Sequence, residues 1–264
     1  MRSLGAFSLM AACALVAAGC GDETTAPTTQ VNSLTQFLPS HAALRNKLRE
    51  IVQEQNGGLG FEMWATIVNR NGTVVDVVFS GESRDDQWPA SRAISAQKAN
   101  TANALSLDGF ALSSANLFAA TQPGGSLFGL QESNPVDTRV AYAGPPSSWG
   151  TESDPMIGKR MGGINVFGGG LALYAPGGNL IGGIGLSGDT SCSDHIKAWK
   201  LRHALNLDNV PAGPDVDSNT DNIIYTEGTL DGFEHPTCFD LDGQGNHIEI
   251  GNALPETHPV GPDE

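Results

Sequence analysis

The chain of 264 residues is long enough for one large domain with appendages. Its 14 Lys and Arg residues stand against 29 Asp and Glu residues, which gives a formal net charge of −15. The sequence has no basic patch, so we expect neither a nucleic-acid partner nor electrostatic attachment to an anionic membrane.

The first segment, residues 1–19, has the features of an export signal peptide. A basic residue, Arg2, precedes an apolar run from Leu9 to Ala18 that is too short to span a bilayer as a stable helix. The residues before Cys20 match a bacterial lipobox, apart from an Ala where Leu is usual. We therefore expect an exported protein, anchored in the cell envelope by a lipid on Cys20, on the periplasmic or outer-membrane face. A plain signal peptide that is cut nearby is the alternative.

Residues 20–36 are polar and rich in Thr and Pro, which predicts a flexible tether.

The segment from residue 37 to residue 207 carries the hydrophobic patterns of a folded domain. Leu44, Leu48 and Ile51 repeat at helical spacing behind a capping Ser, and an Asn-Gly turn joins two alternating runs that suit a β-hairpin. Residues 89–105 begin with a Pro and carry Ala-rich faces, which favours a second long helix there. In chain order, the sequence predicts a helix at 40–55, strands at 61–69 and 73–79, a helix at 89–105, a short helix at 113–121, and an irregular connection at 131–161 with a short helix near 155–161.

Glycines are concentrated between residues 162 and 188. Gly inside a strand costs stability and often marks a bulge or the close approach of another backbone. We predict one strand over 164–174 with a bulge at 168–170, a returning strand at 180–186, and a closing helix at 191–205. The glycines lack the following Lys-Ser/Thr of a phosphate loop and the Gly-x-Ser-x-Gly pattern of a nucleophile elbow. The order of elements predicts an α+β fold, with an antiparallel sheet flanked by helices.

The remaining residues, 208–264, form an acidic, irregular and turn-rich C-terminal extension. Two short runs in it, 222–225 and 247–250, have the composition of strands. The acidic runs that begin at Asp215 and Asp240 resemble calcium loops, but they lack the turn Gly and the closing Glu, respectively. We interpret both as solvated turns, with calcium binding as the alternative.

Two cysteines remain in the predicted mature protein besides Cys20, because a third is removed with the signal. This pair, Cys192 and Cys238, is predicted to form a disulfide, since thiols of exported proteins pair readily. The disulfide would pin the extension to the closing helix. The alternative is a zinc site, because Cys192-x-x-His195 and His235-x-x-Cys238 offer two ligand pairs with the spacing of one helical turn.

Three stretches of the chain resemble the GlcG/HbpS-like heme-binding family. They are the hairpin at 61–79, the Ala-rich helix at 91–102, and the glycine-rich strands at 162–188 with the helix that follows them. The resemblance covers about residues 40–207 and implies a profilin-like sheet, assembly into a symmetric homo-oligomer and a heme-related role. The connection at 122–161 is longer than in short members of the family, and the extension at 208–264 is additional.

Heme requires an apolar cleft and an axial ligand such as His, Met, Cys or Tyr. On the closing helix, His195, Trp199 and His203 are spaced four residues apart and share one face, so we predict that they bind the cofactor. The alternatives are a hydrogen bond from His195 to a nearby carbonyl or carboxylate, and a place in the core for Trp199. Further candidate ligands are His41, Met156 and Met161.

The sequence contains no Cys-x-x-Cys-His motif for covalent heme and no triad or paired carboxylates that make a positive case for catalysis. We therefore expect a lipoprotein that binds heme or a related tetrapyrrole at the cell envelope. One alternative is a non-catalytic oligomeric scaffold that binds partners at the membrane surface through the connection at 122–161. Another is a small-molecule enzyme of unknown reaction.

Overall fold

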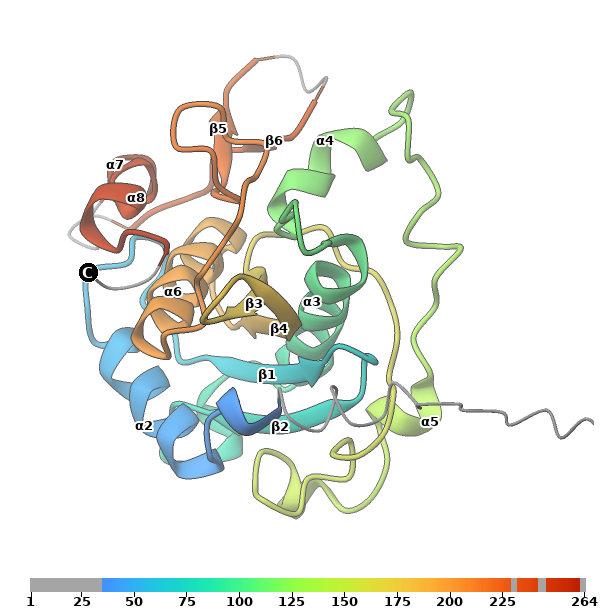
Figure 1. Ribbon diagram of the computed structural model, residues 1–264. Helices are drawn as coiled ribbons and strands as arrows, with labels where there is room; N and C mark the ends of the chain where they lie inside the picture. Colours follow the sequence, from blue (N-terminus) through green and yellow to red (C-terminus); the bar gives the residue numbers. More distant parts are fainter. Residues whose placement is uncertain (1–34, 229–231, 242–245, 262–264) are drawn as a thin grey trace, which may run out of the picture.

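The computed structural model describes residues 35–228, 232–241 and 246–261, so the predicted signal peptide, Cys20 and most of the tether lie outside the described residues. A four-stranded antiparallel sheet in the order β2-β1-β4-β3 forms the centre of the molecule (Figure 1). Its strands are β1 (Trp64–Asn69), β2 (Val74–Phe79), β3 (Gly170–Ala175) and β4 (Asn179–Ser187). The predicted α+β class with an antiparallel sheet is confirmed.

Three long helices flank this sheet: α2 (His41–Val52), α3 (Ser91–Leu105) and α6 (Ser191–Ala204). They match the predicted helices within one to three residues at most ends. The shorter elements are η1 (Thr35–Phe37), η2 (Arg84–Asp86), η3 (Ala115–Leu117), α4 (Phe118–Thr121), α5 (Thr138–Ala141), η4 (Pro146–Ser148), β5 (Ile224–Thr226), β6 (Glu234–Pro236), α7 (His247–Asn252) and α8 (Leu254–Thr257). Among the described residues, none of these helices has the length and apolarity needed to cross a membrane.

The two faces of the sheet support different packing layers. Side chains alternate along β1, so Ala65 and Ile67 pack in one core with α2 and α6, while Trp64 and Val68 pack in the other with α3. The predicted irregular connection contributes Met156 and further residues to this second core. It is also fixed by a completely buried ion pair between Asp154 and Arg92 of α3. Most of the connection is therefore part of the domain.

Glycines of β3 and β4 form the surface on which α3 lies. A Cβ atom at Gly185 would lie 2.0 Å from the carbonyl oxygen of Ser95, and one at Gly183 would lie 2.3 Å from that of Ala99. Gly170 on β3 meets the backbone of α3 in the same way. The glycines expected to mark a close backbone approach do so, and the backbone that they approach is that of α3.

Three local predictions are wrong. Residues 164–167 are not a strand, because Asn165 donates its N–H to Thr101 on α3 instead of to a strand, and sheet pairing begins only at Gly170. The predicted bulge is therefore the bend before β3. Residues 155–161 form turns instead of a short helix. Residues 247–250 belong to helix α7, because the side chain of Asn246 caps the N–H groups of Ile248 and Glu249.

The close packing of α3 on the sheet predicts a stability loss in Gly185→Ala. The added methyl would overlap the helix backbone, and overpacking of this kind costs about 1–3 kcal/mol. Gly109→Ala is the matched control, because a Cβ there meets nothing within 4 Å. Urea unfolding should show a lower midpoint for Gly185→Ala and an unchanged midpoint for the control; equal midpoints would contradict the packing described here.

Candidate functional site

The face of α6 that carries the predicted site is the surface on which the C-terminal extension docks. Trp199 donates its indole N–H to the carbonyl of His258 at 2.9 Å. One turn further on, Arg202 forms a two-point ion pair with Asp221 at 2.7 and 2.8 Å, and both side chains are fully buried. The helix is therefore enclosed by the sheet on one side and by the extension on the other.

The first turn of α6 is covalently joined to the extension. Cys192 and Cys238 form the predicted disulfide, with a Cα–Cα distance of 6.0 Å. Cross-linking residues 46 positions apart in sequence stabilises a fold by about 4 kcal/mol in the chain-entropy description. The alternative zinc set is not assembled, because the histidine beside the two sulfurs is His247, while His195 and His235 have other partners.

His195 is completely buried under the extension. Its Nε2 accepts the backbone N–H of Ile223 at 3.2 Å, and its Nδ1 has no hydrogen-bond partner within the described part of the chain. Burial, assisted by the charge of Arg202, lowers the pKa of His195 to about 3, so the ring is neutral. The alternative to heme ligation was a hydrogen bond from His195 to a carbonyl or carboxylate, whereas in the structure His195 accepts a backbone N–H.

The other two predicted residues on this face have separate surroundings. Trp199 is a core residue, with its ring centroid 6.3 Å from that of His195. His203 is partly exposed, and its Nδ1 lies 2.8 Å from a carboxylate oxygen of Asp208. With the extension docked, a porphyrin cannot reach the buried ring of His195, so this face does not fit a heme. The assignment of heme to these three residues stays a prediction.

The further candidate ligands are also engaged. His41 lies at the start of α2, where its Nδ1 is 2.7 Å from a carboxylate oxygen of Asp76. Met156 and Met161 are both buried in the core under α3. None of these three side chains lies on α6, so they do not extend the predicted site.

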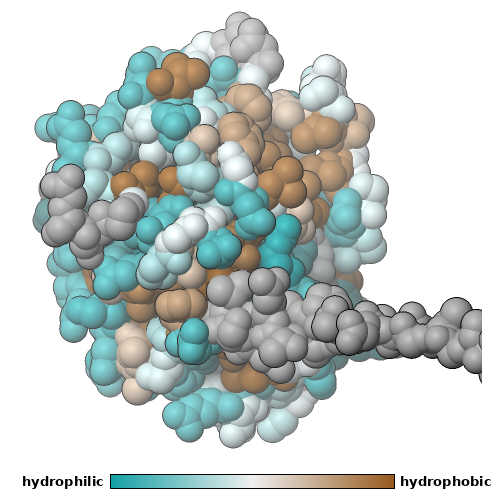
Figure 2. All heavy atoms as spheres, in the orientation of Figure 1, coloured by the Kyte–Doolittle hydropathy of each residue, from teal (hydrophilic) through white to brown (hydrophobic). Residues whose placement is uncertain are grey.

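A separate cavity of about 610 Å³ opens beside α4. Aliphatic side chains, glycines and Phe233 make up most of its wall, with Leu117 and Ala120 on the helical side and Leu127 on the turn opposite. Figure 2 shows hydrophobic residues gathered over α4 and the segment that follows it, and among the exposed apolar side chains there are Leu127 and Phe128. The described lining contains no charged residue and no His, Met, Cys or Tyr. The described lining therefore suits an apolar ligand but supplies no axial ligand for iron.

The sequence did not identify which side chains within the extension hydrogen-bond one another. His247 holds its Nδ1 2.6 Å from Asp240, the residue that begins one acidic run. Asp215, which begins the other, accepts hydrogen bonds within its own turn from Asp217 and Ser218. Calcium binding finds no support in these contacts. One sequence signal could have predicted helix α7: Asn246 is a good helix cap and directly precedes His247, where the helix starts.

The buried histidines predict a loss of stability in weak acid. Burial lowers the pKa of His235 to about 4, as it lowers that of His195 to about 3. Unfolding restores the pKa of each histidine to about 6.5. Below pH 6.5 the unfolded chain therefore binds protons that the folded chain does not. The free energy of unfolding should be greatest above pH 6.5 and should fall by roughly 1–2 kcal/mol per histidine between pH 6.5 and 5.

Denaturant unfolding at several pH values tests this dependence. In His195→Gln, the fall between pH 6.5 and 5 should be smaller by one histidine's share, because glutamine can still accept the N–H of Ile223 but does not titrate. A variant with the same pH dependence as the parent would show that His195 is not held neutral.

Comparison with known proteins gives this domain a family. Residues 41–201 match the family model described as "Haem degrading protein HbpS-like". A comparison with curated proteins gives no match.

Similar solved structures include Klebsiella pneumoniae ORFY of family DUF336, with 22% identity over 63% of this chain and 90% of that one and a TM-score of 0.42. A PduOC complex with heme has 23% identity over 64% and 96% of the two chains, with a TM-score of 0.44. HbpS has 17% identity over 63% and 89%, with a TM-score of 0.38. Because the family match spans more than half of the sequence, from α2 to the last turn of α6, the chain belongs to the HbpS-like family.

Proposed function

We propose that this protein binds heme or a related tetrapyrrole. The observation that carries the proposal is its membership of a family whose description names haem. The cavity beside α4 supports it independently, because small-molecule sites are usually concave, mostly apolar and between 300 and 1,000 Å³ in volume. Most of the described lining belongs to the family's domain, and Gly232 and Phe233 of the extension complete it.

The cavity determines how the tetrapyrrole is held in this proposal. Its described lining offers apolar contacts for the ring faces and the neutral polar side chains of Gln122 and Ser126 for ring substituents. Binding therefore depends on the apolar body of the ligand and not on a bond to iron. A bound heme would supply iron chemistry, while the protein residues bind the macrocycle and exclude water from its faces.

Titration with hemin and with iron-free protoporphyrin tests this mode of binding. We expect both ligands to bind, with a shifted Soret band for hemin. Ala120→Trp should weaken both by at least about tenfold, or ~1.4 kcal/mol, because the indole fills the cavity. Ala42→Trp, on the exposed side of α2, is the matched control and should bind as the parent does.

His195→Ala separates this site from the one predicted on α6. We expect it to leave the binding of both porphyrins unchanged. Loss of hemin binding in His195→Ala, together with normal binding in Ala120→Trp, would overturn the cavity and favour iron ligation by His195. No binding of either porphyrin by the parent protein would overturn the proposed function itself.

We further propose that the protein is exported and anchored to the cell envelope by a lipid on Cys20, with residues 20–36 as the tether. The disulfide between Cys192 and Cys238 supports export, because such bonds persist in oxidising compartments. The symmetric homo-oligomer implied by the family resemblance is part of the same proposal.

Lipidation has a direct test. Cells that express the full chain should incorporate labelled palmitate into it, and a Cys20→Ala variant should lose the label because the acylated sulfur is gone. Equal labelling of both proteins, or labelling of neither, would contradict the lipid anchor.

A further inference from the structure

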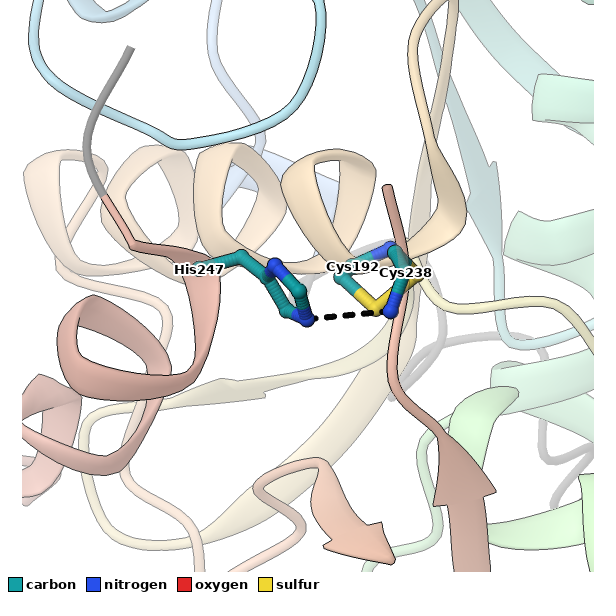
Figure 3. Close-up of side chains that lie close together, drawn as sticks. All are labelled: Cys192, Cys238 and His247. Atoms are coloured by element: carbon teal, nitrogen blue, oxygen red, sulfur yellow. Dashed lines mark hydrogen bonds between the residues drawn. A yellow bond between two sulfur atoms is a disulfide. The ribbon is translucent and has the colours of Figure 1, made fainter. Parts of the chain in front are cut away.

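Three side chains with metal-ligating atoms meet where the extension joins α6. Cys192 comes from the first turn of α6, Cys238 follows β6, and His247 begins α7 (Figure 3). The two sulfurs and one imidazole nitrogen all lie within 4.8 Å of one another. The sulfurs are bonded to each other in the disulfide, and the imidazole points toward it.

His247 is oriented as a metal-ligating histidine is. Its Nδ1 donates to Asp240 at 2.6 Å, so its Nε2 carries the lone pair, which accepts the backbone N–H of Cys238 at 3.0 Å, a bond that a cation would replace. Asp240 is itself fixed by the N–H of Gly58 at 2.6 Å. A carboxylate behind the second ring nitrogen is the usual outer partner of a histidine that binds zinc, because it sets the tautomer and the direction of the ring.

The surroundings of the sulfurs favour thiolates once the disulfide is reduced. The Sγ of Cys238 accepts the backbone N–H of Cys192 at 3.2 Å, within the first turn of α6. The hydroxyl of Ser191 lies 3.6 Å from the same sulfur. Unpaired N–H groups at a helix start stabilise negative charge and lower the pKa of a thiol. Cys192 is fully buried and Cys238 is partly exposed, so a reductant approaches the bond from the Cys238 side.

We propose that reduction of this disulfide creates a binding site for a zinc-like divalent cation, held by Cys192, Cys238 and His247. Two thiolates and one imidazole are ligands that zinc prefers, and a site with three protein ligands keeps a fourth position for water. The disulfide is then the closed, metal-free state of the same residues. This site is independent of the proposed tetrapyrrole cavity, and the two can fail separately.

The chemistry balances in two steps. A dithiol reductant gives two electrons and two protons to the disulfide, so the S–S bond breaks, two thiols form, and the dithiol becomes a disulfide. The cation then displaces both thiol protons to solvent and forms two bonds to sulfur and one to nitrogen. Rotation of the cysteine side chains moves the sulfurs apart to admit the ion. Reoxidation of the thiolates to the disulfide by a thiol oxidant releases the ion.

Cobalt(II) is the probe, because its absorption reports both thiolate ligation and tetrahedral geometry. The full chain would carry Cys13→Ser and Cys20→Ser, so that Cys192 and Cys238 are its only thiols. The protein is reduced with a water-soluble phosphine, which takes up the oxygen of water as it is oxidised. We expect a thiolate-to-cobalt charge-transfer band and tetrahedral d–d bands in the reduced protein only, both abolished by one equivalent of zinc.

Variants test each part of the site. His247→Ala should lose the tetrahedral spectrum, and Asp240→Asn should weaken binding by about 10–100-fold while the ligands remain. His203→Ala is the matched control, because this histidine also lies between α6 and the extension but pairs with Asp208. It should bind cobalt as the parent does.

Three outcomes would overturn the proposal: equal cobalt binding by oxidised and reduced protein, an unchanged spectrum in His247→Ala, or no cobalt binding after reduction. Near-ultraviolet circular dichroism follows the fold during these measurements. If reduction unfolds the protein, refolding on addition of zinc that requires His247 supports the site. Zinc binding by an unfolded chain without dependence on His247 counts against it.

Discussion

The burial of α6 on both sides is the constraint on which the rest of the structure depends. A helix between a sheet and a second layer must bury its polar residues, and buried charges need partners. Asp194 pairs with Lys98 of α3 at 2.7 Å, and Lys197 pairs with Asp189 at 2.9 Å. Both of these pairs lie within the family's domain. Arg202 takes its partner, Asp221, from the extension, so this buried ion pair joins the extension to the end of α6.

This enclosure divides the molecule into two chemically different regions. His195 and Cys192 of α6 are buried beneath the extension, and there the accessible chemistry is that of the disulfide, through the partly exposed Cys238, with His247 beside it. The open apolar surface lies beside α4, where the cavity and exposed Phe128 are found. A ligand with large apolar faces therefore has a site beside α4, while a redox reagent or metal ion has one where the disulfide joins α6 to the extension.

Local patterns predicted what depends on local physics. The spacing of Leu44 and Leu48 fixed α2, and the Asn-Gly turn fixed the hairpin of β1 and β2, because each segment carries its own signal. The pairing of Cys192 with Cys238 followed from counting the cysteines of a chain that was predicted to be exported. The glycines of β4 predicted a close backbone approach, but nothing in the sequence identified α3 as the approaching helix.

The predictions failed where long-range contacts decide the outcome. Residues 164–167 have a strand-like composition, yet they pack against the helices because the bend at Gly169, with φ of +111°, delays sheet pairing. Likewise, the shared face of His195, Trp199 and His203 was predicted correctly as a helical face, but helical spacing does not tell a ligand site from a docking surface. The extension that covers this face lies beyond the part of the chain in which the resemblance was recognised.

The anchors of the extension are distributed so that no single one holds it. The disulfide fixes it at the first turn of α6, while Trp199 and Arg202 fix it near the last turn. Between these, Leu241 and Asp240 hydrogen-bond the backbone of Gly58 in the loop after α2. Loss of the disulfide removes one of these connections and leaves the rest, including the one that positions Asp240 behind His247. Reduction should therefore free the sulfurs without removing the histidine from their side, which is the condition that a metal site at this junction requires.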